Sequence, residues 1–358
     1  MMSKAGRVHE TVERNSDHPE PVLALTRRKL VVTLGSLGVG LALVMVIALN
    51  WGSEPIDAAV IYHLLEESIR GGAATTRSPE ATILLSIRLP RVMLGAVTGA
   101  ALSVAGAVLQ ALLRNPLAEP YVLGISSGAA LGALLALIAL PTTLLAQPVA
   151  AFMGALVTMT LIYAMSRTQV GMSTERLVLA GIITASFLWS AIAALLVIVH
   201  NPSLRGITFW LMGDLSSGGR GLLGLVAGAV AVGILVAVVL SRSLNLLMVG
   251  EEDAFMLGVD VERVKTLAYI LASLLTGVVV AVSGSVGYVG LIVPHMVRLA
   301  WGGDNRLVVP AAALVGAMFV VLADTVARTA IAPRELPVGA VTALVGAPVF
   351  VYLLRKSP

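Results

Sequence analysis

The chain has few of the residues that a soluble enzyme needs. Its 358 residues include no cysteine, which excludes disulfides, thiolate metal sites and cysteine nucleophiles. Charged residues make up 12%, about half of the roughly 25% found in soluble domains. Hydrophobic residues make up 58%, and the mean hydropathy is +0.94. The sequence therefore predicts an integral membrane protein.

Catalytic and phosphate-binding motifs are missing as well. We find no HExxH, no GxSxG and no Walker A sequence, so the chain cannot hydrolyse ATP by itself and is not expected to be an enzyme. Ionisable residues are almost absent from the long apolar runs, although an ion-coupled carrier or an intramembrane protease would need them there. No metal or cofactor bound by this chain is expected.

Two exceptions lie within the apolar runs. His295 follows Pro294, and it is more simply a packed, hydrogen-bonded histidine than a metal ligand, because no second histidine or carboxylate stands at metal-ligand spacing. Asp324 and Arg328 are four residues apart, which favours a local ion pair on one helix face.

Apolar runs of about 20 residues are long enough to cross a bilayer as α-helices. We therefore expect an all-α polytopic membrane protein, a compact bundle of about ten transmembrane helices. The eighth run is too short to cross alone; either it begins within the GSVGYVG turn, buried inside protein, or the count is nine. The runs span about 30–49, 92–113, 121–140, 149–165, 177–199, 221–240, 266–283, 290–301, 307–327 and 337–354.

The termini and loops suggest an orientation. Residues 1–29 are polar and lack the apolar core of a signal peptide, so we expect a disordered cytoplasmic tail before a permease domain over 30–354. An even number of spans places both termini on one side. Arg27, Arg28 and Lys29 before the first span favour the cytoplasm. The segment 244–260 is then cytoplasmic.

Rows of small residues mark two of the runs. Gly95, Gly99 and Ser103 share one helix face, and Gly124 and Gly128 begin a similar row. Such rows let helix backbones approach closely in lipid. Packing within the chain explains them more simply than a dimer contact does.

An acidic stretch, GEEDAFMLGVD at 250–260, stands out from its apolar surroundings. Its three leading acids favour a helix N-terminus, and Gly258 suits a helix C-cap. Apolar side chains lie between them, and so short a helix is not stable unaided. A protein partner that buries these side chains is favoured over a helix resting on lipid, because anionic headgroups would repel the acids.

Six motifs together resemble one family, the permease subunits of type II ABC importers for iron-siderophores, haem and cobalamin. The resemblance covers roughly residues 30–354. The motifs, in chain order, are RLPRVMLGAVTGAALSVAGAVLQALLRNPLAEPYVLGISSGA at 88–129, MSTERLVLAG at 172–181, FWLMGDLSSG at 209–218, GEEDAFMLGVD, GYVGLIVPHMVRL at 287–299 and ELPVGAVTALVGAPVF at 335–350.

The resemblance implies partners and a location. It implies a homodimer in the inner membrane with the translocation path at its two-fold axis, two ATP-binding subunits on the cytoplasmic side and a periplasmic substrate-binding protein outside. ATP and Mg²⁺ would be bound by the partner ATPase. The formal charge of +4 is modest, and no nucleic-acid partner is expected.

The resemblance also assigns three groups of site residues. The coupling helix, which inserts into the ATPase, would comprise Glu251, Glu252, Asp253, Ala254, Phe255, Met256, Leu257 and Gly258. The cluster that docks the binding protein, at an outer rim exposed to water, would comprise Arg88, Arg91 and Arg328, with Arg334 as a neighbour. The cytoplasmic gate would comprise Asn115, Leu117, Ser173 and Thr174.

Each assignment has a simpler alternative. An isolated outer arginine can extend its head group into water. Asn115 before Pro116 is an ordinary turn residue, and Ser173 and Thr174 before Glu175 are ordinary helix N-cap residues. Residues 204–214 are expected to form a short helix at the outer mouth, although Phe209 and Trp210 there could instead be membrane-interface anchors.

The substrate class stays open at this point. Sparse charge in the spans suits a wide, weakly binding path for a bulky chelate, and ferric siderophores, haem and cobalamin all qualify. A secondary transporter without an ATPase partner is the main alternative, and it predicts inverted repeats with ionisable residues at mid-membrane. A purely structural scaffold would leave the acidic stretch and the outer arginines unexplained.

Overall fold

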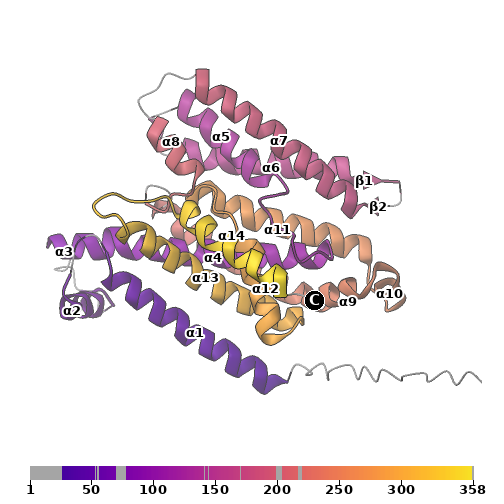
Figure 1. Ribbon diagram of the computed structural model, residues 1–358, viewed down its shortest axis with the longest axis horizontal. Coiled ribbons are helices and arrows are strands. Elements are labelled where there is room, and N and C mark those ends of the chain that lie inside the picture. Colours follow the sequence, from indigo (N-terminus) through magenta and orange to yellow (C-terminus); the bar gives the residue numbers. More distant parts are fainter. Residues whose placement is uncertain are drawn as a thin grey trace, which may run out of the picture.

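The computed structural model describes residues 26–52, 54, 56–69, 78–140, 142–143, 145–169, 171–198, 204–216 and 220–356. Most of the expected N-terminal tail, residues 1–25, lies outside these ranges. The described chain is a bundle of helices (Figure 1). The prediction of an all-α membrane protein is confirmed.

Every expected span has a helix in the structure. Seven described helical segments are long and apolar enough to cross a membrane, and three apolar helices are shorter. The long ones contain α1 (Arg27–Asn50), α4 (Leu89–Leu112), α6 (Ala146–Ser166), α7 (Thr174–Ile198), α9 (Leu223–Val249), α11 (Val261–Ser283) and α13 (Asn305–Thr329). The short ones are α5 (Ile125–Ala139), α12 (Val289–Trp301) and the stretch Val338–Tyr352 of α14 (Val338–Lys356).

Small elements complete the described chain. The short helices α3 (Pro79–Ala81) and η2 (Thr82–Arg88) run into α4 as one continuous helical segment. A two-stranded antiparallel hairpin, β1 (Arg167–Thr168) and β2 (Gly171–Met172), joins α6 to α7. The remaining elements are α2 (Ala58–Ile69), α8 (Leu204–Leu211), η3 (Arg220–Leu222) and α10 (Glu251–Met256).

The short helices α5 and α12 both begin inside the bundle. Each follows a residue in the left-handed conformation, Gly124 with φ of 75° and Tyr288 with φ of 68°. Gly284, Ser285 and Val286, which lead into α12, are buried. Non-helical backbone is tolerated at membrane depth where protein covers it. The eighth expected run is therefore a helix that begins in the partly buried GSVGYVG turn, as the first alternative predicted, and the count of ten spans stays a prediction.

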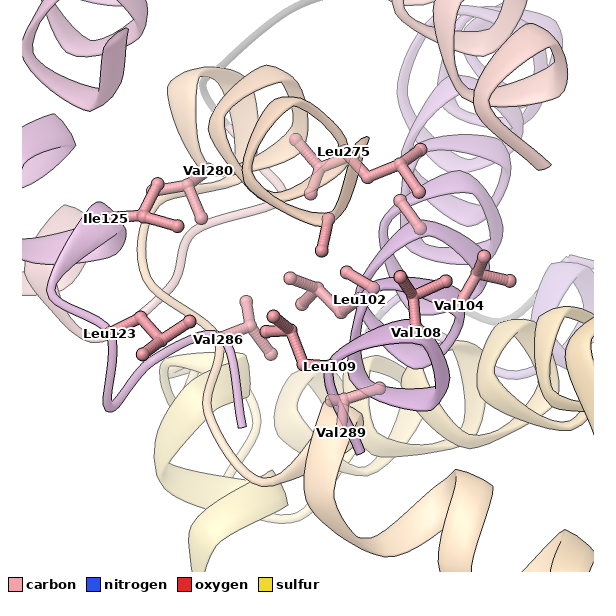
Figure 2. Packing of buried hydrophobic residues seen from close by; sticks show 14 of the residues in the cluster. Leu102, Val104, Val108, Leu109, Leu123, Ile125, Leu275, Val280, Val286 and Val289 are labelled. Atoms are coloured by element: carbon pink, nitrogen blue, oxygen red, sulfur yellow. The ribbon is translucent and has the colours of Figure 1, made fainter. Parts of the chain in front are cut away.

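The core of the bundle is formed by α4, α11 and α13. The apolar windows of these three segments are 78%, 72% and 67% buried, whereas that of α1 is only 6% buried. Figure 2 shows Leu109 of α4 near Val289 at the start of α12, with Val286 between the α4 side chains and Leu123. The start of α12 is thus supported by α4, the most buried helix, whereas α5 packs on α6, α7 and α11.

The small-residue rows pack within the chain, as expected. A Cβ added to Gly99 on α4 would lie 2.0 Å from the carbonyl oxygen of Gly316 on α13. A Cβ on Gly128 of α5 would lie 2.0 Å from Thr158 Oγ1 on α6. Both helix pairs therefore approach too closely for any side chain.

The two ends of the bundle carry different elements. In Figure 1, α10, the β1–β2 hairpin, the beginning of α1 and the C-terminus lie toward one end, and α2, α3 and α8 lie toward the other. Both ends of the helical domain are thus on the side of the acidic stretch. We call this side the coupling end and the opposite side the outer end.

Candidate functional site

The acidic stretch forms the short helix α10 at the coupling end. Gly258 has a φ of 84°, which favours glycine. Its N–H donates to the Phe255 carbonyl oxygen, and the N–H of Val259 donates to that of Ala254. These two bonds are the Schellman motif that ends a helix. The expected C-cap at Gly258 is confirmed, and the chain turns sharply into α11.

The tip of α10 presents apolar side chains outward. Phe255, Met256 and Leu257 are 69%, 83% and 66% exposed, whereas Ala254 is fully buried against the bundle. An adjacent groove of about 770 Å³ is lined by Glu251, Phe255, Gly258, Val259, Asp260, Val261, Glu262 and Lys265. A projecting apolar tip beside a groove lined by both charged and apolar residues is a surface suited to a protein partner.

The acids of α10 divide into two kinds. Glu252 and Asp253 are exposed. Glu251 instead turns inward: its Oε2 accepts from Lys265 Nζ at 2.9 Å, and its Oε1 lies 3.7 Å from Arg114 Nη2. Lys265 is only 5% exposed. Glu251 therefore neutralises a buried cation of α11, and a contact between Glu251 and an ATPase stays a prediction.

The predicted gate residues after α4 form a turn. Asn115 Oδ1 accepts from the N–H of Leu117 at 2.9 Å, which is the side-chain turn expected of asparagine before proline. Leu117 is 45% exposed at the coupling end. The local alternative for Asn115 thus holds, and a gate role for these two residues stays a prediction.

The predicted gate residues before α7 form its N-terminus. Ser173 Oγ accepts from the N–H of Arg176 at 3.3 Å, so Ser173 caps the helix that begins at Thr174. Met172, just before them, donates its N–H to both carboxylate oxygens of Glu262 on α11, at 2.8 and 2.9 Å. Sequence analysis missed Glu262, since this bond joins residues 90 positions apart.

The outer arginines are buried and do not form an exposed rim. Arg88, Arg91 and Arg328 are only 4%, 8% and 5% exposed. The expectation that they lie in water at the outer mouth is wrong, because all three are used within the chain. Their part in docking a binding protein stays a prediction.

Arg91 and Arg328 share one buried carboxylate. Arg91 Nη2 lies 2.9 Å from Asp324 Oδ1, and its Nη1 lies 2.9 Å from Glu335 Oε2. Arg328 Nε lies 3.3 Å from Asp324 Oδ2, which confirms the local ion pair predicted from their spacing. Asp324 is 2% exposed. A carboxylate so deeply buried requires this pairing.

Two of the outer arginines, Arg88 and Arg328, also hydrogen-bond to the end of α1. Arg88 donates to the carbonyl oxygens of Leu49 and Glu54, the former at 3.0 Å. Arg328 donates to the carbonyl oxygen of Ala48 at 2.9 Å. The last carbonyl groups of a helix have no partner within it and attract cations. We call the five charged side chains described in this paragraph and the preceding one the outer charge cluster; they are Arg88, Arg91, Asp324, Arg328 and Glu335.

A mostly apolar cavity of about 720 Å³ opens beside the start of α12. Glu119, which is 9% exposed, lies in its wall and accepts from the N–H of Tyr288. Sequence analysis missed Glu119. The wall comprises Glu119, Tyr121, Val122, Trp189, Leu211, Met212, Ser285, Gly287, Tyr288, Leu291, Gly339, Ala340, Ala343, Ala347, Phe350 and Val351.

The remaining candidates are less conspicuous. His295 on α12 is half-buried. Among the residues that the structure describes, no group of three or more histidine, aspartate or glutamate residues could hold a metal ion. The expected outer helix is present as α8, and Trp210 within it is buried, which argues against a membrane-interface anchor at that position.

Comparison with known proteins identifies relatives of the chain. It is 42% identical to an uncharacterised ABC transporter permease, YvrB, of Bacillus subtilis over 88% of this chain and 91% of that one. It is 40% identical to the cobalamin import permease BtuC of Halobacterium salinarum, over 94% and 90%. It is also 42% identical to the hemin transport permease HmuU of Yersinia pestis, over 77% and 84%.

A solved structure agrees with these relatives. A metal-chelate type ABC transporter in an inward-facing conformation superposes with a TM-score of 0.77 at 30% identity, covering 91% of this chain and 99% of that one. The model of the FecCD transport family matches residues 40–356, nearly the whole of the helical bundle. The chain belongs to the FecCD transport family.

Proposed function

We propose that the protein is the translocation subunit of an ATP-driven importer that moves a bulky metal chelate into the cytoplasm. The substrate class comprises ferric siderophores, haem and cobalamin, which matches the names of the relatives. The subunit works as a homodimer in the inner membrane, with both termini cytoplasmic. Two ATP-binding subunits and a periplasmic binding protein complete the importer.

One observation carries this proposal above all: the exposed apolar tip of α10. Phe255, Met256 and Leu257 would be costly to leave in water, and the acids around them disfavour anionic lipid. A groove on an ATPase subunit would cover them. A secondary transporter would have no use for such a projection.

The interior supports a bulky substrate. The wall of the cavity beside α12 is mostly apolar and contains Trp189, Tyr288 and Phe350. Aromatic walls offer broad, weak contacts to a large ring system, and a substrate held this loosely can leave again. The cavity is a candidate part of the path.

The outer end would receive the binding protein. Since the arginines of the outer charge cluster are buried, we expect the contact at Glu335, the member of the cluster whose side chain is 37% exposed, and at its exposed neighbour Arg334. Exposed charges of this kind steer a partner more than they hold it.

The proposal is tested by replacing Phe255 and Leu257 together with aspartate. An acid placed in a buried apolar contact costs several kcal/mol, so the partner ATPase should no longer co-purify, while the permease itself should melt as the wild type does. The control is Ile331→Asp, which places one aspartate on a half-exposed apolar residue outside α10, between α13 and α14. Co-purification of the ATPase at wild-type yield with the double variant would refute the assignment.

A further inference from the structure

Two carboxylates stand on either side of the exposed tip of α10. Glu251 is its first residue, and Glu262 lies in the first turn of α11. Each carboxylate contacts the residue that directly precedes a predicted gate residue. Glu251 lies beside Arg114, the neighbour of Asn115, and Glu262 accepts from Met172, the neighbour of Ser173.

The bond from Glu262 is the stronger link. Both carboxylate oxygens accept the N–H of Met172, and bonds to a charged acceptor are stronger than neutral ones. The partner segment approaches very closely. A Cβ added to Gly171 would come within 2.3 Å of Glu262 Oε2, and Gly171 has a φ of 126°. Glycine at this position lets the hairpin sit directly on the carboxylate.

Further contacts join α6, which precedes the hairpin, to α11 one to two turns beyond Glu262. The rings of Tyr163 on α6 and Tyr269 on α11 are stacked with centroids 6.1 Å apart. The hydroxyl of Tyr163 lies 3.3 Å from Thr266 Oγ1. The end of α6, the hairpin and the start of α7 are therefore fastened to α11, directly after the coupling helix.

The bond from Glu251 is the weaker link. Its oxygen lies 3.7 Å from Arg114, and the two side chains are 33% and 43% exposed, so water screens the pair. Lys265 nevertheless fixes Glu251 in place from the buried side. The segment after α4 is thus connected to α10 by a weak charge contact. The hairpin is connected to the first turn of α11 by a stronger hydrogen bond.

We propose that Glu262 is a positioning residue that carries the displacement of the coupling helix to the hairpin and the start of α7. The inference rests on the proposed function, since it needs an ATPase that moves α10. When α10 and the first turn of α11 shift together, Glu262 draws Met172 with them, and Ser173 and Thr174 follow. The loop after α4 follows less closely, because its link is weaker.

The test compares backbone amide exchange in the complex of permease and ATP-binding subunits, without nucleotide and trapped with ATP and vanadate. In the wild type, trapping should change exchange both at residues 250–258 and at residues 171–176. In Glu262→Ala, the change at 250–258 should persist and the change at 171–176 should be lost. A purely structural role would raise exchange at 171–176 in both states and keep their difference.

Two further variants sharpen the test. Glu262→Gln keeps an oxygen acceptor for Met172 and should restore the nucleotide-dependent change. Glu175→Ala removes an exposed glutamate from the first turn of α7 and should behave as the wild type. A nucleotide-dependent change at 171–176 that survives in Glu262→Ala would overturn the inference alone. If no ATPase binds, or if 250–258 do not respond in the wild type, the proposed function itself fails and the inference with it.

Discussion

The two ends of the molecule reverse the usual placement of residues in opposite ways. At the outer end, charged side chains are buried: Asp324 is 2% exposed and Arg91 8% exposed. At the coupling end, large apolar side chains are exposed, and Met256 reaches 83%. Each reversal is costly unless a partner compensates for it.

The two ends differ in whether the groups that compensate for this cost lie within the chain. The outer charge cluster contains its own counter-ions, since Asp324 lies between Arg91 and Arg328. The tip of α10 has no such cover within the described chain, because Phe255, Met256 and Leu257 all point away from the bundle. Within the described chain the outer charges are therefore paired, whereas the apolar tip of α10 is left exposed, as the proposed contact with an ATPase requires.

The largest effect is expected from removing the central carboxylate of the outer charge cluster. Asp324→Ala leaves two buried arginines without their counter-ion, and breaking a buried pair in this way costs about 3–5 kcal/mol. The purified permease should melt well below the wild type in a detergent thermal scan. Glu335→Gln, at a partly exposed position, is the control and should shift the melting temperature little. Wild-type melting of Asp324→Ala would mean that the cluster is not complete in itself.

An intermediate effect is expected at the cap of α10. In Gly258→Ala the new Cβ meets no atom within 4 Å, so the cost comes only from the left-handed backbone and is about 1 kcal/mol. If only the docked segment is affected, the affinity for the ATPase falls about fivefold while the melting of the permease is unchanged. Titration of the ATPase subunit onto reconstituted permease measures this.

Gly303→Ala provides the matched control for the cap. It also places a Cβ in open space, but its backbone φ is not in the left-handed region. We expect no loss of ATPase affinity. A loss of melting temperature in Gly258→Ala would instead show that α10 supports the bundle, and the contrast between the two ends would weaken.

The smallest effect concerns a carboxylate at the coupling end. Asp304 caps α13 and, like Asp324, bonds to an arginine, but its side chain is 26% exposed. Hydrogen bonds from Arg306, followed by that from Asn245, lower the pKa of Asp304 to about 2. The folded state thus gains stability above the ordinary pKa of the group, 3.8, and this gain is lost as the pH falls from about 4 to about 2.

The pH effect is measured by denaturant unfolding at several pH values. The difference in stability between the wild type and Asp304→Asn should be constant above about pH 4 and should shrink toward pH 2. Because the group is partly in water, the difference should be far smaller than that of Asp324→Ala. A difference that does not depend on pH would show that Asp304 acts only as a neutral cap.

Much of the fold could be predicted because its signals are local. Each of the ten apolar runs corresponds to a helix, and the i,i+4 spacing correctly predicted the Asp324–Arg328 pair. The acids and glycine of α10 likewise predicted its start and its cap. In each case the residues that form the feature are close neighbours in the sequence.

The rest depends on contacts between distant parts of the chain. Arg91 meets Asp324 across 233 residues, and Glu119 meets Tyr288 across 169. Whether an arginine near a helix end reaches water or an internal carboxylate depends on which helix packs beside it. Sequence alone therefore placed the outer arginines at a rim exposed to water. It also gave no indication that Glu262 contacts Met172.

The attachment of α1 has a consequence for how the protein is made. This helix is held at its two ends, by Lys29 donating to the carbonyl oxygen of Trp301 at 2.9 Å and by Arg328 donating to that of Ala48. Both partners are synthesised more than 250 residues after the groups that they hold, since the separations are 272 and 280. During insertion α1 can therefore pack at first on earlier elements such as α2 and α4, with Arg88 bonded to its end, and its docking against α13 is a late step in assembling the subunit.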